Sequence, residues 1–275
     1  MDAAEAAERL NDEGYVVLEG LISPQAAAGL DAQARAAVAS CAATGVGSTP
    51  WENGGYLSLE GALNREPQLA ALVEHPLLLA IAEIVLQTPS FEQYNNVALK
   101  WVRPGVGEGG LHADWPQSQT PVPWPITAPM LQVFWALTPF TETNGATRCV
   151  PFSHHTRRGP LRQSYPEQEC AMVATAGSAI LFHSGLWHRQ GANTSTEHRM
   201  AANLAYCPTW WARPVANWPL IEREVFDGLS TRMQELSTSS VEQTGRGFND
   251  GSQAGVHSHT RLREERLGAA GAPRL

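Results

Sequence analysis

The stretch GSAILFHSGLWHRQGANTSTEHRMAANLAYCP, residues 177–208, contains two apolar runs separated by a polar segment. The first run, 178–183, ends at a histidine, and the second, 199–207, begins at an arginine. Short apolar runs bounded by turn-forming residues are typical of strands in antiparallel sheets. The stretch therefore predicts two core strands joined by a segment that carries polar side chains.

The same rhythm begins well upstream, at residue 91. Short apolar or alternating runs are broken there by Gly, Pro and Asn, and they predict four more strands, at 94–103, 130–138, 146–150 and 170–175. Such spacing indicates an antiparallel β-sandwich or barrel. The pair Asn144-Gly145 favours a tight reversal, so strands 130–138 and 146–150 are expected to be paired or adjacent.

Helical patterns flank this β-rich part. The N-terminal part predicts a helix, then a strand within 14–22, then an Ala-rich helix that begins at Ser23-Pro24. In all, helices are expected at 3–11, from Pro24 to about Ser40, and at 66–74, 76–86 and 219–236. The fold class predicted from these patterns is mainly β with flanking helices.

Length and composition indicate one globular domain. The chain has 275 residues, 43% hydrophobic and 17% charged, which is enough for a full hydrophobic core. We expect a single domain over 1–236. Residues 237–275 are rich in Ser, Gly, Gln and Arg without hydrophobic periodicity, and are expected to be a flexible tail.

The charge, the apolar runs and the N-terminal sequence lead to expectations about binding partners and cellular location. The net charge is −8, and the basic residues form no cluster of the density that nucleic-acid binding needs, so we expect no nucleic-acid partner. No apolar run reaches the ~18 residues of a membrane span, so no membrane is expected. The N-terminus lacks a basic start followed by an apolar stretch, which predicts a cytoplasmic protein.

The segment LHADW, residues 111–115, carries the first candidate metal ligands. Side chains two apart in an extended segment point to the same side, so His112 and Asp114 can reach one ion together. A second histidine from a distant strand would complete the two-His, one-carboxylate site of non-haem iron(II). His183 and His188, which leave the same predicted strand, are both candidates for that third ligand.

Arg199 adds a possible anion site, since a guanidinium binds a small carboxylate bidentately and stays charged when buried. It follows His188 by eleven residues and starts the last predicted strand. A metal with open positions beside a carboxylate clamp indicates a chelating dicarboxylate. The proline-rich loop 115–129 lies beside the ligands in sequence, and its Trp115 and Trp124 are expected to line or cover a substrate pocket.

At this point the chain resembles the phytanoyl-CoA dioxygenase-like (PhyH) branch of the iron(II)/2-oxoglutarate-dependent oxygenases. The resemblance spans roughly residues 10 to 210 and is carried by GYVVLEGLIS near the start, VRPG at 102–105, HAD at 112–114, NGATRCVPFSH at 144–154, and GSAILFHSGLWHRQGANTS with Arg199. It departs from the pattern in the loop GVGEGG before HAD and in PFSH where PGSH is usual.

The resemblance implies a double-stranded β-helix (jelly-roll, cupin-like) core and the cofactors iron(II), 2-oxoglutarate and O2. It makes His112, Asp114 and His188 the metal ligands, with His188 preferred to His183 because only His188 has the arginine at the family spacing. It places the far carboxylate of 2-oxoglutarate on Arg199. Gln132 is implied as a further cosubstrate contact, with Arg103 and Gln190 as weaker candidates.

The implied function is a dioxygenase that oxidises a small molecule, expected to belong to secondary metabolism, with release of succinate and CO2. Hydroxylation is the expected reaction, and desaturation, cyclisation and epimerisation are alternatives. The sequence leaves the oligomeric state open, with a homodimer as one alternative. The alternative of another class is a non-catalytic cupin-like protein that binds a metal or a small molecule; zinc there would favour a tetrahedral site and need no arginine clamp.

Overall fold

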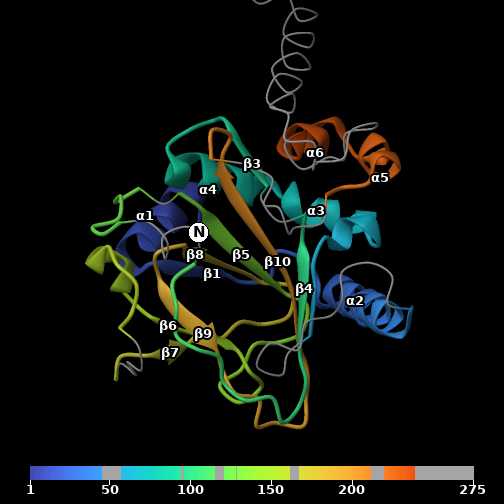
Figure 1. Ribbon diagram of the computed structural model, residues 1–275, viewed down its shortest axis with the longest axis horizontal. Helices are drawn as coiled ribbons and strands as arrows, with labels where there is room; N and C mark the ends of the chain where they lie inside the picture. Colours follow the sequence, from blue (N-terminus) through green and yellow to red (C-terminus); the bar gives the residue numbers. More distant parts are fainter. Residues whose placement is uncertain are drawn as a thin grey trace, which may run out of the picture.

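The computed structural model describes residues 1–44, 57–93, 96–114, 121–127, 129–161, 167–211 and 220–238 (Figure 1). Ten strands form two antiparallel sheets in this part of the chain. The large sheet has the order β1-β8-β5-β10-β4-β2, and β3 also pairs with β10. Its strands are β1 (Tyr15–Leu18), β2 (Leu57–Leu59), β3 (Phe91–Gln93), β4 (Ala98–Val102), β5 (Leu131–Ala136), β8 (Ala179–His183) and β10 (Arg199–Pro208).

The small sheet has the order β7-β6-β9. It consists of β6 (Thr147–Val150), β7 (Cys170–Ala171) and β9 (Trp187–Gln190). In β6 and β9, Cys149 lies opposite His188. The small sheet thus presents a candidate metal ligand on one of its edge strands.

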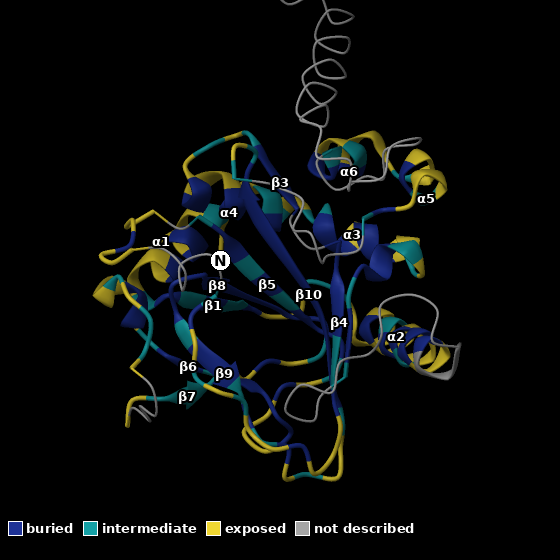
Figure 2. Ribbon diagram, viewed as in Figure 1, coloured by how far each residue is buried: buried dark blue, intermediate teal, exposed yellow. Residues whose placement is uncertain are grey.

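Helices cover the outer face of the large sheet. The α-helices are α1 (Ala3–Glu13), α2 (Pro24–Thr44), α3 (Ala70–Val73), α4 (Pro76–Leu86), α5 (Arg223–Gly228) and α6 (Thr231–Leu236), and the 3-10 helices are η1 (Ala62–Asn64), η2 (Pro67–Leu69) and η4 (Ser153–Thr156). The Asp2 side chain caps α1 by accepting from the Glu5 N–H, and Gly14 ends it at φ 90°. Figure 2 shows that these helices bury one face and expose the other.

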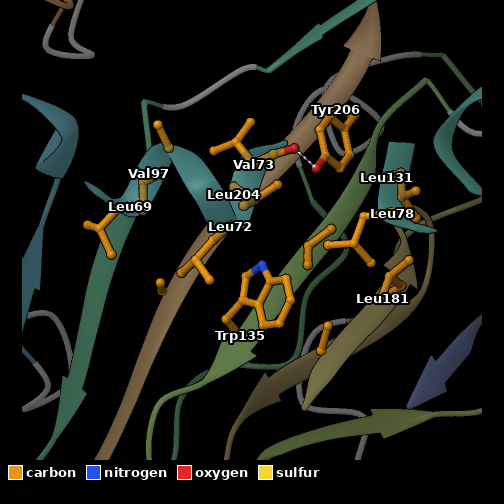
Figure 3. Packing of buried hydrophobic residues seen from close by; sticks show 14 of the residues in the cluster. Leu69, Leu72, Val73, Leu78, Val97, Leu131, Trp135, Leu181, Leu204 and Tyr206 are labelled. Carbon is orange, nitrogen blue, oxygen red and sulfur yellow. Dashed lines mark hydrogen bonds between the residues drawn. The ribbon is translucent and has the colours of Figure 1, made fainter. Parts of the chain in front are cut away.

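The larger hydrophobic core lies between the helices other than η4 and the large sheet. Along β10 the side chains alternate, so that Met200, Leu204 and Tyr206 face the helices. Figure 3 shows Trp135 of β5 and Tyr206 among leucines of the helices and strands, and the Tyr206 hydroxyl donating to the Val73 carbonyl at 2.6 Å. Each fully buried large side chain of this kind contributes roughly 1.5–3 kcal/mol.

A second, smaller hydrophobic cluster lies on the inner face, between the two sheets. It contains Ala201 of β10, Phe182 of β8 and Cys149 of β6. Because side chains alternate along a strand, Arg199 and Asn203 share the inner face with Ala201, and Gln132 shares it with Ala136. The polar groups of the candidate site therefore surround this cluster.

The mainly β fold with flanking helices is confirmed, but parts of the sequence-based prediction were wrong. Strands 130–138 and 146–150 were expected to be paired or adjacent, whereas β5 and β6 lie in different sheets. The reason is that 137–146 crosses between the sheets, with Asn144 bridged to Asn193 instead of turning a hairpin. Strand β9 was not predicted, because WHRQ is short and polar.

The helix expected at 219–236 is two short helices, α5 and α6. Its described part is interrupted where the Ser230 side chain accepts from the Met233 N–H and begins α6 anew. The domain prediction for 1–236 remains a proposal, and the predicted tail, 237–275, lies outside the described residues except for its first two.

No single described helix is both long and apolar enough to cross a membrane. The bent pair Pro67–Val73 and Pro76–Leu86, at 55° to each other, meets the length and composition criterion only when taken together. Within α4, Leu78, Ile81 and Val85 are buried in the main core, which accounts for the apolar composition of that helix.

Candidate metal centre

The backbone places the two sequence-adjacent candidates beside the distant one. The His112 N–H donates to the His188 carbonyl at 3.0 Å, and the His188 N–H donates to the His112 carbonyl at 2.8 Å. Two residues on, the Asp114 N–H donates to the Ser184 carbonyl at 3.0 Å. The segment 112–114 therefore runs antiparallel to the chain that enters β9, and the extended backbone turns His112 and Asp114 to one side.

The tautomers of both histidines follow from their hydrogen bonds. His112 Nδ1 lies 2.8 Å from the Gly110 carbonyl, and His188 Nδ1 lies 2.9 Å from the Leu186 carbonyl. A carbonyl oxygen only accepts, so Nδ1 carries the proton in each ring. In the neutral form of such a ring, Nε2 carries the lone pair that a metal ligand requires.

The donor atoms of the three residues converge. His188 Nε2 is 3.6 Å and His112 Nε2 is 3.9 Å from Asp114 Oδ1, and one ligand atom from each residue lies within 4.8 Å of the others. Ligands about 2.1 Å from one ion at right angles lie about 3 Å apart, so a small closing movement would suffice. Asp114 Oδ2 is buried and has no hydrogen-bond partner among the described residues, as expected of an atom that faces a cation.

Burial sets the electrostatics of the centre. His188 is buried, and this lowers its pKa, while the nearby Asp114 carboxylate raises it and the nearby His112 lowers it. The lowered pKa keeps the imidazole neutral at physiological pH, when its Nε2 can coordinate a metal. His112 is more open, with about half of its side chain exposed (53%). The centre thus has a buried side at His188 and an accessible side at His112.

The rival histidine, His183, occupies a different environment. Its Nδ1 accepts from the Gly185 N–H at 2.8 Å, and its ring lies 5.0 Å from that of His154. Burial lowers the pKa of His183 to about 3, with a further contribution from His154. In the described part of the chain, the group of side chains that could share a metal contains His188 and not His183.

Arg199 starts β10 on the inner face of the large sheet. Its side chain is buried, with Nε and Nη2 donating to the Gly145 carbonyl at 3.1 and 2.9 Å. Its guanidinium carbon lies 4.7 Å from the centre of the Phe140 ring. Gly145 has a φ of 84°, and a Cβ there would meet Val102 at 2.7 Å, so only glycine fits at this carbonyl.

Of the other predicted cosubstrate residues, two lie on strand faces that carry further site residues and one lies at the surface. Gln132 lies on the inner face, and its Oε1 accepts from Asn203 Nδ2 at 3.2 Å. Gln190 shares a face of β9 with His188, and its Nε2 donates to the Gly107 carbonyl at 3.1 Å. Arg103 lies on an exposed turn after β4. The structure therefore brings Gln132 and Gln190 to faces that carry other site residues, and leaves Arg103 at the surface.

A pocket of ≈ 390 Å³ opens beside His112. It is lined by Leu111, His112, Ala113, Val122, Trp124, Arg158, Gly159 and Pro160. Trp124 is buried there, and its backbone N–H donates to the Arg157 carbonyl at 2.8 Å. Trp115, the other predicted substrate residue, lies outside the described residues.

Sequence reasoning missed three polar residues that the fold places at or near the site. Asn203 bonds Gln132, and the parity of β10 with Arg199 would have indicated its inward direction. Lys100, opposite Ala201 in the sheet, donates to Glu60 at 2.7 Å on the same inner face. Arg158 lines the pocket, and nothing in its local sequence indicated that position.

Comparison with known proteins shows which family this chain matches. Residues 10–201 match the family model described as phytanoyl-CoA dioxygenase (PhyH). The chain is also similar to dioxygenase af480 of Aspergillus fumigatus, with 31% identity over 145 residues. That match covers 52% of this chain and 46% of the relative, so the chain spans about half the length of that protein.

Solved structures show the same fold. The α-ketoglutarate-dependent epimerase SnoN from nogalamycin biosynthesis is similar with a TM-score of 0.59 and 20% identity, covering 75% of this chain and 83% of that one. SnoN has also been solved with Fe3+, α-ketoglutarate and nogalamycin RO. The carbocyclase SnoK from the same biosynthesis gives a TM-score of 0.56 and 21% identity, covering 76% and 86%.

Proposed function

Because this chain belongs to the phytanoyl-CoA dioxygenase (PhyH) family, we propose that it hydroxylates a small molecule of secondary metabolism and converts 2-oxoglutarate to succinate and CO2. The matched residues, 10–201, are a dioxygenase domain of the class that uses iron(II), 2-oxoglutarate and O2, which makes the protein an oxidoreductase. The observation that carries the proposal for this chain is the convergence of His112, Asp114 and His188.

These three residues would hold the iron. Their donor set is two imidazole nitrogens and one carboxylate, the arrangement that suits non-haem iron(II) and leaves three positions open. The Gly110 and Leu186 carbonyls orient the two rings, and such outer hydrogen bonds fix the tautomer. When bound, the iron with 2-oxoglutarate and oxygen supplies the oxidising chemistry for a C–H bond.

Arg199 would bind the far carboxylate of 2-oxoglutarate. Its side chain is buried on the inner face, where the low dielectric strengthens a charge-assisted hydrogen bond. The Gly145 carbonyl and the Phe140 ring hold the guanidinium in one orientation, which lowers the entropic cost of the grip. Gln132 and Gln190 are the additional polar contacts that we assign to the cosubstrate.

The substrate would enter the pocket beside His112, the open side of the centre. Trp124 offers a buried indole in the pocket wall, which favours an apolar or ring-containing molecule. SnoN and SnoK, which share the fold, are named as an epimerase and a carbocyclase. On this chain, desaturation, cyclisation and epimerisation are therefore the alternatives to hydroxylation.

Uncoupled turnover tests the proposed function without knowledge of the substrate. Purified protein with iron(II), ascorbate, 2-oxoglutarate and O2 should form succinate slowly. Asp114→Ala and His188→Ala should reduce succinate to the level of a metal-free control, while His183→Gln should retain its formation. Succinate no higher than that control in the wild-type protein, with every substrate offered, would favour the non-catalytic binding protein instead.

A further inference from the structure

The pocket beside His112 combines a positive charge with aliphatic and aromatic side chains. Among the described residues that line it, Arg158 alone has a permanently charged side chain. Leu111, Ala113 and Val122 supply aliphatic surface, and Trp124 supplies an aromatic ring. Apolar surface by itself does not distinguish ligands by their charge, whereas a cation in the pocket wall favours anionic ligands.

The guanidinium of Arg158 makes no hydrogen bond or ion pair with any residue in the described part of the chain. Its neighbour Arg157 donates through Nε to the Trp124 carbonyl, and Arg189 pairs with Glu169 at 2.7 Å and with Glu108 at 2.8 Å. The hydrogen bonds at Arg158 involve only its backbone carbonyl. Five N–H donors at the pocket wall are thus available to a ligand.

The backbone of Arg158 is nevertheless held firmly relative to the metal centre. Trp187, the residue before His188, donates from Nε1 to the Arg158 carbonyl at 2.8 Å, and Thr156 Oγ1 donates to the same oxygen at 3.3 Å. A Cβ at Gly159 would lie 3.5 Å from the Trp124 ring, so the loop and the indole are in contact. This support fixes the backbone from which the exposed arginine side chain extends.

We propose that Arg158 is a specificity-determining residue that binds a carboxylate of the substrate, while the apolar body of the substrate packs on Trp124. The inference rests on the proposed function, since it names the class of substrate for that site. The substrate is then a small carboxylic acid with an aromatic or otherwise apolar body. Its carboxylate is distinct from those of 2-oxoglutarate, whose clamp, Arg199, starts a strand on the buried inner face.

Matched probe pairs test the proposal. The probes are benzoate, 1-naphthoate and 9-anthracenecarboxylate, each with its neutral carboxamide. Calorimetry uses the full chain with Mn(II) in place of iron(II) and saturating 2-oxoglutarate, so that Arg199 is occupied. At least one acid should bind about 10-fold more tightly than its amide, which corresponds to about 1.4 kcal/mol.

Arg158→Gln should abolish the preference by weakening the acid and leaving the amide unchanged, and Arg158→Lys should restore part of it. Arg223→Gln, on the exposed surface of α5, is the matched control and should keep the wild-type preference. An equal loss of acid and amide binding, a preference that survives Arg158→Gln, or a wild-type protein that prefers no acid or binds no probe would overturn the proposal. Succinate formation by the wild-type protein tests the proposed function separately.

Discussion

At the scale of single residues, His183 shows how a buried histidine differs from a metal ligand. Burial lowers its pKa to about 3, whereas the unfolded value is 6.5. Between these two pH values His183 binds a proton in the unfolded chain but not in the folded one. This residue therefore does not reduce the free energy of unfolding above pH 6.5, and reduces it increasingly as the pH falls below that value. We expect a loss of about 2 kcal/mol from this residue by pH 5.

Equilibrium unfolding in urea at pH 7.5 and pH 5 measures this loss. His183→Leu should reduce the difference in unfolding free energy between the two pH values, whatever it does to the absolute stability. Val133→Ala, a buried and non-titrating site in β5, should be destabilised with the wild-type difference retained. An unchanged difference in His183→Leu would show that acid sensitivity arises elsewhere.

Gly145 is the second residue whose role can be measured. Its φ of 84° and the 2.7 Å that would separate an added Cβ from Val102 predict that Gly145→Ala lowers stability by about 1–3 kcal/mol. Because the Gly145 carbonyl holds Arg199, the KM for 2-oxoglutarate should also rise. Gly20→Ala is the control: φ is 63° there but the space is open, so it should lose less stability and leave KM unchanged.

At the scale of elements, the Tyr206 hydroxyl connects β10 to the end of α3. It is fully buried and donates to the Val73 carbonyl at 2.6 Å. Tyr206→Phe leaves that carbonyl without its donor, and we expect a loss of about 1–3 kcal/mol in urea unfolding. Tyr15→Phe removes only a 3.9 Å contact with a thiol and should cost less. Equal losses would contradict a specific role for the bond.

At the scale of the whole molecule, a bound metal would connect the segment 112–114 to β9 in the small sheet. Any ligand that binds only the folded state stabilises it, by about 2.7 kcal/mol at 100 times Kd. Mn(II) with 2-oxoglutarate should therefore raise the Tm in a thermal melt, and a chelator should reverse the increase. Asp114→Ala should show no metal-dependent increase; a wild-type Tm that is insensitive to both additions would contradict the assigned site.

The sequence by itself determined the features that are local. A strand over 199–207 necessarily puts Met200 and Leu204 on one face and Arg199 on the other, because neighbouring side chains on a strand point to opposite faces. The spacing of His112 and Asp114 likewise placed both side chains on one side of an extended segment.

The tertiary structure decided what depends on distant contacts. The bridge between residues 112 and 188 places His188, and not His183, beside the carboxylate, although the two histidines flank the same turn. Sheet membership separated β5 from β6, and packing brought Arg158 to the pocket. Periodicity is a property of neighbouring residues, whereas these arrangements arise from hydrogen bonds and packing between segments far apart in the chain.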